Sequence, residues 1–173
     1  ADCPNGTKRI EYLKSKVITF IHEASKYDPD GVDVLTFGQT VTPYRNVTAE
    51  AAEKVVNGLV ADEGMTDTAG LIAAAFALHQ EGGYEQTVLF VATDGAPANR
   101  AAVKDVIVDI SHQLKHEHEF AISFLTVGQI DDGLRAFLTE LDDDLTEAKH
   151  DIVDVKELAL VDFMKAFVGA LHD

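Results

Sequence analysis

The chain has 173 residues, a length that suits one domain and lets it bury roughly 70% of the surface that its unfolded form exposes. It carries 14 Lys and Arg against 30 Asp and Glu, a formal charge of −16, and 46% of its residues are hydrophobic. The hydrophobic fraction argues against disorder, and the charge argues against DNA, RNA or anionic membranes as partners. A single cysteine excludes an internal disulfide framework and a Cys-rich zinc site.

No apolar run reaches the ~20 residues that a membrane span needs, and no signal-peptide pattern is present. We therefore expect a cytoplasmic protein, with an extracellular location as the alternative if the chain is a fragment. The chain begins at Ala1 rather than at Met, which we expect of a processed chain or of a fragment.

The first half of the chain predicts helices and strands in alternation. Residues 8–27 show helical spacing of apolar side chains, namely Ile10, Leu13, Val17, Phe20, Ile21 and Ala24. Residues 32–37 predict a short strand. Residues 39–46 predict a more polar strand at a sheet edge, because Pro43 lacks the N–H that a central strand donates. Thr48 predicts the N-cap of a helix over 49–60.

The second half of the chain continues the alternation with stronger signals. Residues 87–92 and 120–127 are continuously apolar and β-branched, which is typical of strands buried on both faces. The remaining segments predict helices over 68–80, 99–115 and 131–145, a short strand over 151–155 and a closing helix over 156–171.

This alternation predicts an α/β fold with a mostly parallel sheet and helices on both faces. Sheets of this kind bind ligands at the carboxyl ends of their strands. We therefore expect the functional residues in the loops 38–40, 64–68 and 93–99.

The segment TVLFVATDGAPAN, residues 87–99, delivers Asp94 to the carboxyl edge of a buried strand. Thr93 and Gly95 flank Asp94, and Gly95 allows the chain to turn away from the sheet. A carboxylate in this place suits a divalent cation, held directly or through water. The residues leave open the alternative that Asp94 only caps the loop or the following helix.

A second polar segment, GMTDTAGLIAAAF over residues 64–76, precedes the helix predicted from Thr68. The Thr66 hydroxyl could face a metal ion. Taken alone, the segment favours a helix start capped by Asp67 or Thr68, since Ser, Thr and Asp are preferred at this position.

The two segments together, in this order, resemble a von Willebrand factor type A (VWA) domain. The segments DGVDVLTFG (30–38), GMTDTAGLI (64–72), VLFVATDGAPAN (88–99) and FAISFLTVG (120–128) resemble its strand and loop regions. The stretch from residue 121 to residue 155 is similar to small bacterial members of the family, and the resemblance covers essentially the whole chain. It implies a Rossmann-like fold with strand order 3-2-1-4-5-6.

The resemblance also implies a metal-ion-dependent adhesion site. In the family this site combines an Asp-x-Ser-x-Ser loop, a threonine in a second loop and an aspartate in a third. The last two correspond to Thr66 and Asp94, with Asp67, Thr93 and Gly95 shaping the loops. The implied cofactor is Mg²⁺, with Mn²⁺ or Ca²⁺ as alternatives. The implied partner is a protein that donates a carboxylate to the ion.

The Asp-x-Ser-x-Ser loop is not found in the chain. Asp2 is a poor match, because Pro4 and Gly6 stand where the two serines belong. We expect the first strand and its loop to lie upstream of Ala1, and the alternative is a degenerate domain that has lost its metal loop. A fold without the first strand would leave a gap between the strands over 32–37 and 87–92, with unpaired backbone groups, so we favour truncation over natural loss.

Three other features have simpler interpretations. His112 and His116 are four residues apart, which would suit a metal on a helix, but solvated histidines at a helix end are favoured. Asp142–Asp144 lack the spacing of a calcium loop and indicate a solvated acidic surface. Cys3 is expected to be exposed and incidental.

We therefore expect a non-enzymatic protein-interaction module built around a Mg²⁺ site. A metal-free scaffold of the same fold is one alternative. A Rossmann-like metal-dependent phosphohydrolase is another, although no strand ends in the paired Asp-x-Asp that it needs and no base stands beside a nucleophile.

Overall fold

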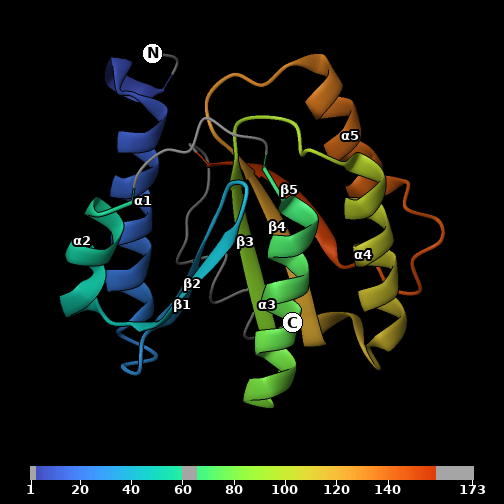
Figure 1. Ribbon diagram of the computed structural model, residues 1–173, viewed down its shortest axis with the longest axis horizontal. Helices are drawn as coiled ribbons and strands as arrows, with labels where there is room; N and C mark the ends of the chain where they lie inside the picture. The colour runs from blue at the N-terminus through green and yellow to red at the C-terminus, as the bar shows by residue number, and fades with distance from the viewer. Residues whose placement is uncertain (1–2, 60–65, 159–173) are drawn as a thin grey trace.

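The computed structural model describes residues 3–59 and 66–158 as an α/β protein whose described strands form two sheets (Figure 1). β1 and β2 form an antiparallel hairpin, and β3, β4 and β5 form a parallel sheet in that order. In chain order the elements are η1 (Pro4–Gly6), α1 (Arg9–Ala24), β1 (Val32–Phe37), β2 (Val41–Val47), α2 (Ala49–Asn57), α3 (Thr68–Gly82), β3 (Thr87–Thr93), α4 (Arg100–Gln113), η2 (Glu117–Glu119), β4 (Phe120–Thr126), α5 (Asp132–Asp143) and β5 (Val153–Glu157). This arrangement confirms the predicted α/β class.

The N-terminal half packs α1 and α2 against the β1–β2 hairpin. Their shared apolar cluster includes Ile21 of α1, Val56 of α2 and Val47 of β2, each at most 3% exposed. The Thr48 side chain accepts a hydrogen bond from the Ala51 N–H, which confirms the predicted N-cap of α2. β2 pairs only with β1 among the described strands, as predicted for a strand that contains Pro43.

The hairpin contains an irregularity that its side chains compensate. The register of the β1–β2 pairing shifts between Val32 and Val34, and the Asp33 carboxylate between them bonds to residues of β2. It accepts the Asn46 N–H at 2.9 Å and pairs with the Arg45 guanidinium at 2.8 Å. Just before β1, Gly31 has φ +92°, and a Cβ there would lie 2.7 Å from the Val47 backbone. Glycine is therefore required at the entry to the hairpin.

The parallel sheet forms the better packed half of the molecule. The β3–β4 register pairs Thr87 with Phe120 and Thr93 with Thr126, and β4 pairs with β5 from Ile122 to Thr126. Helices α3, α4 and α5 cover one face and share a single apolar cluster with it. The members of that cluster that are at most 1% exposed are Ile72, Val91, Val103, Ile107, Phe120, Ile122 and Leu134.

Side-chain caps begin α3, α4 and α5. Asp67, Asn99 and Asp131 each accept a backbone N–H from the residue three positions further on, at 2.8, 3.1 and 2.7 Å. Gly83, with φ +61°, ends α3 in the left-handed conformation. The caps satisfy N–H groups that the first helical turn leaves without an internal partner. The predicted limits of these helices are therefore correct to within three residues.

Some predictions at element ends are wrong. α1 stops at Ala24 rather than Tyr27, because Lys26 and Tyr27 donate their N–H groups three residues back and form a turn. Lys156 belongs to β5 rather than to the start of a helix, since β5 pairs with β4 through Glu157. The rest of the predicted closing helix, from residue 159 onward, lies outside the described residues, as does residue 60 of the second predicted helix.

β3 and β4 differ in burial although their sequences look alike. All residues of β4 except Ala121 are buried, as predicted. In β3 only Val91 is buried, and the other six residues are partly exposed. The prediction that β3 is buried on both faces is therefore wrong. The cause is the edge of β3 away from β4, which pairs with no described strand and faces a cavity.

Candidate functional site

Three loops meet at the carboxyl edge of the strands. The Asp67 N–H donates to the Gly38 carbonyl at 2.8 Å, which ties the loop before α3 to the end of β1. The Ala98 N–H donates to the Thr66 carbonyl at 3.0 Å, which ties the same loop to the segment after β3. The expected loop cluster is therefore real, and β1 and β3 end at the same edge of the molecule.

Thr66 and Asp67 have separate roles in this cluster. Asp67 caps α3 through the Gly70 N–H, as the cap interpretation predicts. The Thr66 hydroxyl lies 3.5 Å from the Ala96 carbonyl and is not a cap. Residues 64 and 65 of this segment lie outside the described residues.

Asp94 lies directly after β3, as expected, and pairs with an arginine. The Arg9 guanidinium stands 3.2 Å from the Asp94 carboxylate and also donates to the Asp94 and Gln129 carbonyls, at 3.4 and 2.8 Å. The Asp94 side chain remains 57% exposed. Next to it, the Thr93 hydroxyl donates to the Gly95 carbonyl at 2.9 Å, which shapes the turn after β3.

Arg9 was missed by the sequence analysis. It begins α1, far from Asp94 in sequence, so no local pattern connects the two residues. It places a positive charge where a cation on Asp94 would stand. The charge of Asp94 is thus already partly balanced by a surface ion pair, a kind of pair that contributes only ~0–1 kcal/mol to stability.

Among the described residues, the oxygen ligands at this edge suit a divalent cation, but only two residues supply them. Thr66 offers a hydroxyl and Asp94 a carboxylate, and both are the hard oxygen ligands that Mg²⁺ and Mn²⁺ prefer. Across residues 3–59 and 66–158, no cluster of three or more His, Cys, Asp or Glu side chains is arranged to hold a metal. Any ion here would keep most of its waters, as Mg²⁺ commonly does.

The other sequence candidates are placed as follows. The His112 Nε2–H donates to the Glu147 backbone carbonyl at 3.0 Å, and His116 lies beyond α4, which ends at Gln113. The two histidines therefore do not share a helix. Cys3 is only 6% exposed and packs with Leu125, so the prediction of an exposed cysteine is wrong.

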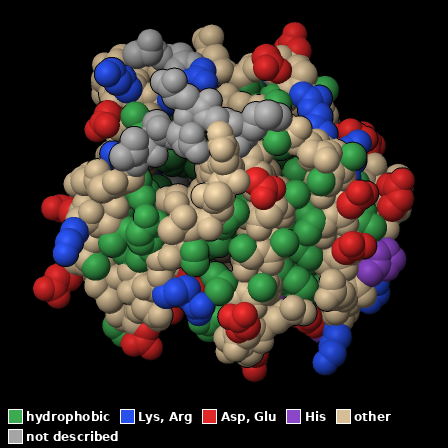
Figure 2. Space-filling view, in the orientation of Figure 1, with side chains coloured by type: hydrophobic (Ala, Val, Ile, Leu, Met, Phe, Trp, Pro, Cys, Tyr) green, Lys and Arg blue, Asp and Glu red, His purple; other side chains and the backbone are tan. Residues whose placement is uncertain are grey.

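The acidic segment at the end of α5 lies largely at the surface, as expected, since Asp143 and Asp144 are exposed. Several acidic side chains lie over α4 and α5, on the right in Figure 2. Asp142 is only partly exposed, and its burial, together with Asp154, Asp143 and Asp151, raises the pKa of its carboxyl.

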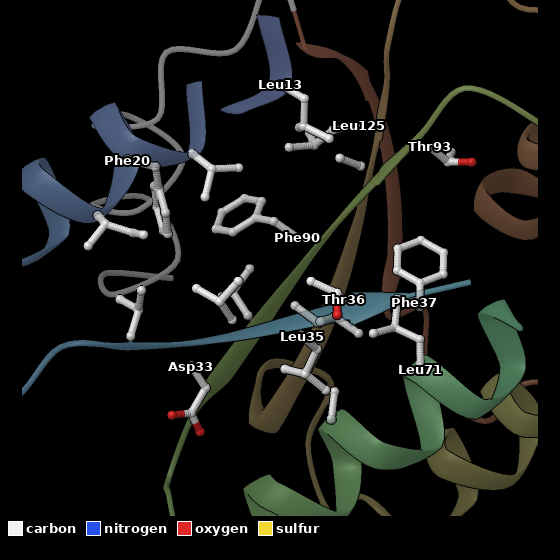
Figure 3. A pocket seen from close by; sticks show the side chains of 18 of the residues that line it. Leu13, Phe20, Asp33, Leu35, Thr36, Phe37, Leu71, Phe90, Thr93 and Leu125 are labelled. Atoms are coloured by element: carbon white, nitrogen blue, oxygen red, sulfur yellow. The ribbon is translucent and has the colours of Figure 1, made fainter. Parts of the chain in front are cut away.

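A large cavity adjoins the loop cluster. Its volume is about 1010 Å³, at the upper end of the usual range for ligand pockets. Every residue of β1 lines it, as do all residues of β3 except Val91, and Thr66, Asp94 and Gly95 stand at its end. Figure 3 shows Phe20 of α1 beside Phe90 of β3 in its lining, and their rings meet edge to face with centroids 5.4 Å apart.

His79 of α3, a buried titratable side chain that the sequence did not single out, lines this cavity. His79 of α3 is 8% exposed, and its Nδ1 lies 2.9 Å from the Thr87 hydroxyl. Its ring stacks on Phe76 and meets Phe120 edge-on. Burial lowers the pKa of His79 below 6.5, and Glu119 opposes that shift. The imidazole is therefore a neutral part of the core near neutral pH.

No helix among the described residues is long and apolar enough to cross a membrane. No protein-family model and no curated protein matches the chain. Among solved structures, the chain is similar to the manganese-loaded TRAP protein of Plasmodium vivax, with a TM-score of 0.58 and 13% sequence identity. The match covers 94% of this chain and 65% of that one, so the chain spans just under two thirds of the TRAP protein's length.

The TRAP protein contains a VWA domain. At 13% identity this likeness speaks for the fold alone. It agrees with the parallel sheet, the helices packed against it and the loops that gather at its carboxyl edge. The chain described here therefore has a mixed α/β fold of the VWA type.

Proposed function

We propose that the chain is a protein-interaction module that binds a partner through a divalent cation at Asp94 and Thr66. The cation is Mg²⁺ or Mn²⁺, and a carboxylate of the partner supplies a further oxygen. The observation that carries the proposal is the convergence of both residues on one edge of a VWA-like fold, held by hydrogen bonds between their loops. The similarity to a protein solved with manganese supports a divalent ion.

The residues of this chain would act on the ion in different ways. The Asp94 carboxylate would supply the negative charge, and the Thr66 hydroxyl would contribute a neutral oxygen. Because few protein charges neutralise it, an ion held in this way remains attractive to an incoming carboxylate. Arg9 would have to release the Asp94 carboxylate before the ion binds.

The test is a titration of Mg²⁺ and of Mn²⁺ by calorimetry, with Arg9→Gln, Asp94→Asn and Thr66→Val as variants. We expect Asp94→Asn to abolish binding and Thr66→Val to weaken it. Arg9→Gln should tighten binding severalfold, because it removes the competing cation. Circular dichroism of each variant verifies the fold. Equal binding by wild type and Asp94→Asn would refute a site at Asp94.

A metal-free scaffold of the same fold is the second candidate. The observation that favours it is the Arg9–Asp94 ion pair, since it balances Asp94 without a metal. The same titration separates the candidates. If Arg9→Gln binds neither ion, the metal site is refuted and the scaffold is supported.

We also propose that the chain is not an enzyme. Asp94 is the only carboxylate in the segment over residues 93–99, and the side chains that bond to this segment from elsewhere include the Arg9 guanidinium and the Thr66 hydroxyl. A phosphohydrolase needs a nucleophile with a base beside it. A screen of phosphomonoesters with Mg²⁺ should show no hydrolysis above that of Asp94→Asn, and turnover that depends on Asp94 would contradict this proposal.

A further inference from the structure

Arg100 is the first residue of α4 and stands next to the loops of the candidate site. Two residues before it, the Ala98 N–H donates to the Thr66 carbonyl at 3.0 Å, which ties the start of α4 to the loop before α3. Figure 1 shows that α4 and α5 both begin at the edge of the molecule where β3 and β4 end. Arg100 therefore lies at the same edge as Asp94, although the sequence analysis did not single it out.

An aromatic ring of α5 holds the Arg100 side chain. Its Cζ lies 5.2 Å from the centroid of the Phe137 ring, and Phe137 is itself only 3% exposed. The guanidinium also lies beside Gly133 of α5, since a Cβ there would stand 3.5 Å from Arg100 Nη2. A guanidinium placed over a ring in this way loses freedom of movement and keeps its N–H donors for other groups.

The positive charge of Arg100 has no acidic partner, although the chain is acidic. The chain carries 30 Asp and Glu against 14 Lys and Arg. Arg9 pairs with Asp94, and Arg45 pairs with Asp33. Within residues 3–59 and 66–158, the exposed Arg100 guanidinium forms neither an ion pair nor a hydrogen bond.

The acidic residue closest to Arg100 in the fold serves another purpose. Asp131 precedes α5, and its carboxylate accepts the Leu134 N–H at 2.7 Å as the cap of that helix. The same oxygen would stand 3.2 Å from a Cβ on Gly133, so it lies on the α5 side of the guanidinium. The donors of Arg100 therefore remain available to a group from outside the chain.

The chemistry of the guanidinium specifies that group. Its planar fork bonds both oxygens of a carboxylate at once, which a lysine ammonium does not do. In the proposed function, a partner brings one carboxylate to the cation at Asp94 and Thr66. A second acidic side chain on the same surface of that partner would meet Arg100.

We propose that Arg100 determines partner specificity by binding a second carboxylate of the polypeptide whose first carboxylate binds the cation. This inference rests on the proposed function and extends it, because it requires a partner with two acidic side chains on one surface. Arg100 contacts the partner and is not a ligand of the ion.

The test compares two short Gly/Ser peptides with blocked ends. One carries Glu at both ends, and the other carries Glu at one end and Gln at the other. NMR titration in Mg²⁺ should show that wild type binds the doubly acidic peptide about two- to fivefold more tightly, as is usual for an exposed ion pair. Arg100→Gln should abolish this preference. Arg100→Lys should retain part of it, since the charge stays and the planar fork is lost.

Arg135→Gln is the matched control. Arg135 of α5 is also exposed and also lacks an ion pair within the described part of the chain, but no described aromatic ring lies under its guanidinium. It should leave the preference largely unchanged, with circular dichroism verifying the fold of each variant. A preference that survives Arg100→Gln, or an equal loss in Arg100→Gln and Arg135→Gln, would overturn the proposal.

The same titration in EDTA separates this proposal from the cation site. If the peptide with one Glu binds equally well in Mg²⁺ and in EDTA, the cation site alone is refuted. The Nε–H signal of Arg100 should still shift with the doubly acidic peptide in EDTA, and a peptide with Gln at both ends should not shift it. No shift with either acidic peptide, with or without Mg²⁺, would overturn the role of Arg100.

Discussion

β3 and β4 are neighbouring strands of similar composition in very different surroundings. β4 lies between β3 and β5 and is buried along nearly its whole length. β3 has β4 on one side and the cavity on the other, and most of its residues are partly exposed. An apolar strand sequence therefore predicts that a strand can be buried. Whether the strand is buried depends on its neighbours, and β3 has a described neighbouring strand on one side only.

The largest expected difference between β3 and β4 is in the unfolding free energy lost when one phenylalanine of each strand is replaced by alanine. Phe124 of β4 is 2% exposed, so Phe124→Ala should cost about 3–5 kcal/mol of unfolding free energy through the cavity that it leaves. Phe90 of β3 is partly exposed and faces an existing cavity, so Phe90→Ala should cost clearly less. Urea unfolding measures both values. Equal costs would mean that the β3 edge is as well packed as β4.

Helix caps offer a smaller comparison between the two halves. Asp131 caps α5 at 2.7 Å in the parallel half, and Thr48 caps α2 at 3.4 Å in the hairpin half. We expect Asp131→Ala to cost about 1 kcal/mol and Thr48→Ala less. The same unfolding experiment measures both, and a larger cost for Thr48→Ala would contradict the geometry.

His79 predicts a pH dependence of stability. Because burial lowers its pKa in the folded chain, the unfolded chain binds the proton more readily just below pH 6.5. The free energy of unfolding should therefore fall as pH falls from 6.5 toward the folded pKa. His79→Gln should reduce this slope, and exposed His22→Gln should not. Identical slopes for all three proteins would exclude His79 as the cause.

The raised pKa of Asp142 predicts a smaller pH dependence of stability, in the direction opposite to that of His79. This raised pKa means that the ionised carboxylate of Asp142 is disfavoured in the folded chain near neutral pH. Asp142→Asn should therefore stabilise the protein slightly at pH 7, and the gain should shrink as pH falls through the raised pKa toward 3.8. Thermal unfolding at pH 7 and at pH 3.8 measures the gain, with exposed Asp144→Asn as the control. An equal gain at the two pH values would point to a cause other than charge.

Most of the fold could be predicted from the sequence because helix caps, edge prolines and apolar runs act on residues close to them in the chain. The caps Thr48 and Asp67, the edge proline Pro43 and the apolar run of β4 each act through near neighbours. The burial of β3, the contact between Cys3 and Leu125, and the Arg9–Asp94 pair could not be predicted in this way. Each depends on residues far apart in the chain.

The candidate site was predicted in part for the same reason. The turn after a strand and the loop before a helix placed Asp94 and Thr66 at one edge. Nothing in either segment indicates that Arg9 reaches Asp94, or that the cavity ends at these residues.

The central proposal is tested most directly by NMR with Mn²⁺, which broadens signals of nearby amides. We predict selective broadening at Gly38, Thr66 and Gly95 in wild type, and none there in Asp94→Asn. Broadening confined to the acidic residues around Asp142, or unchanged in Asp94→Asn, would contradict a cation site at the carboxyl edge of β3.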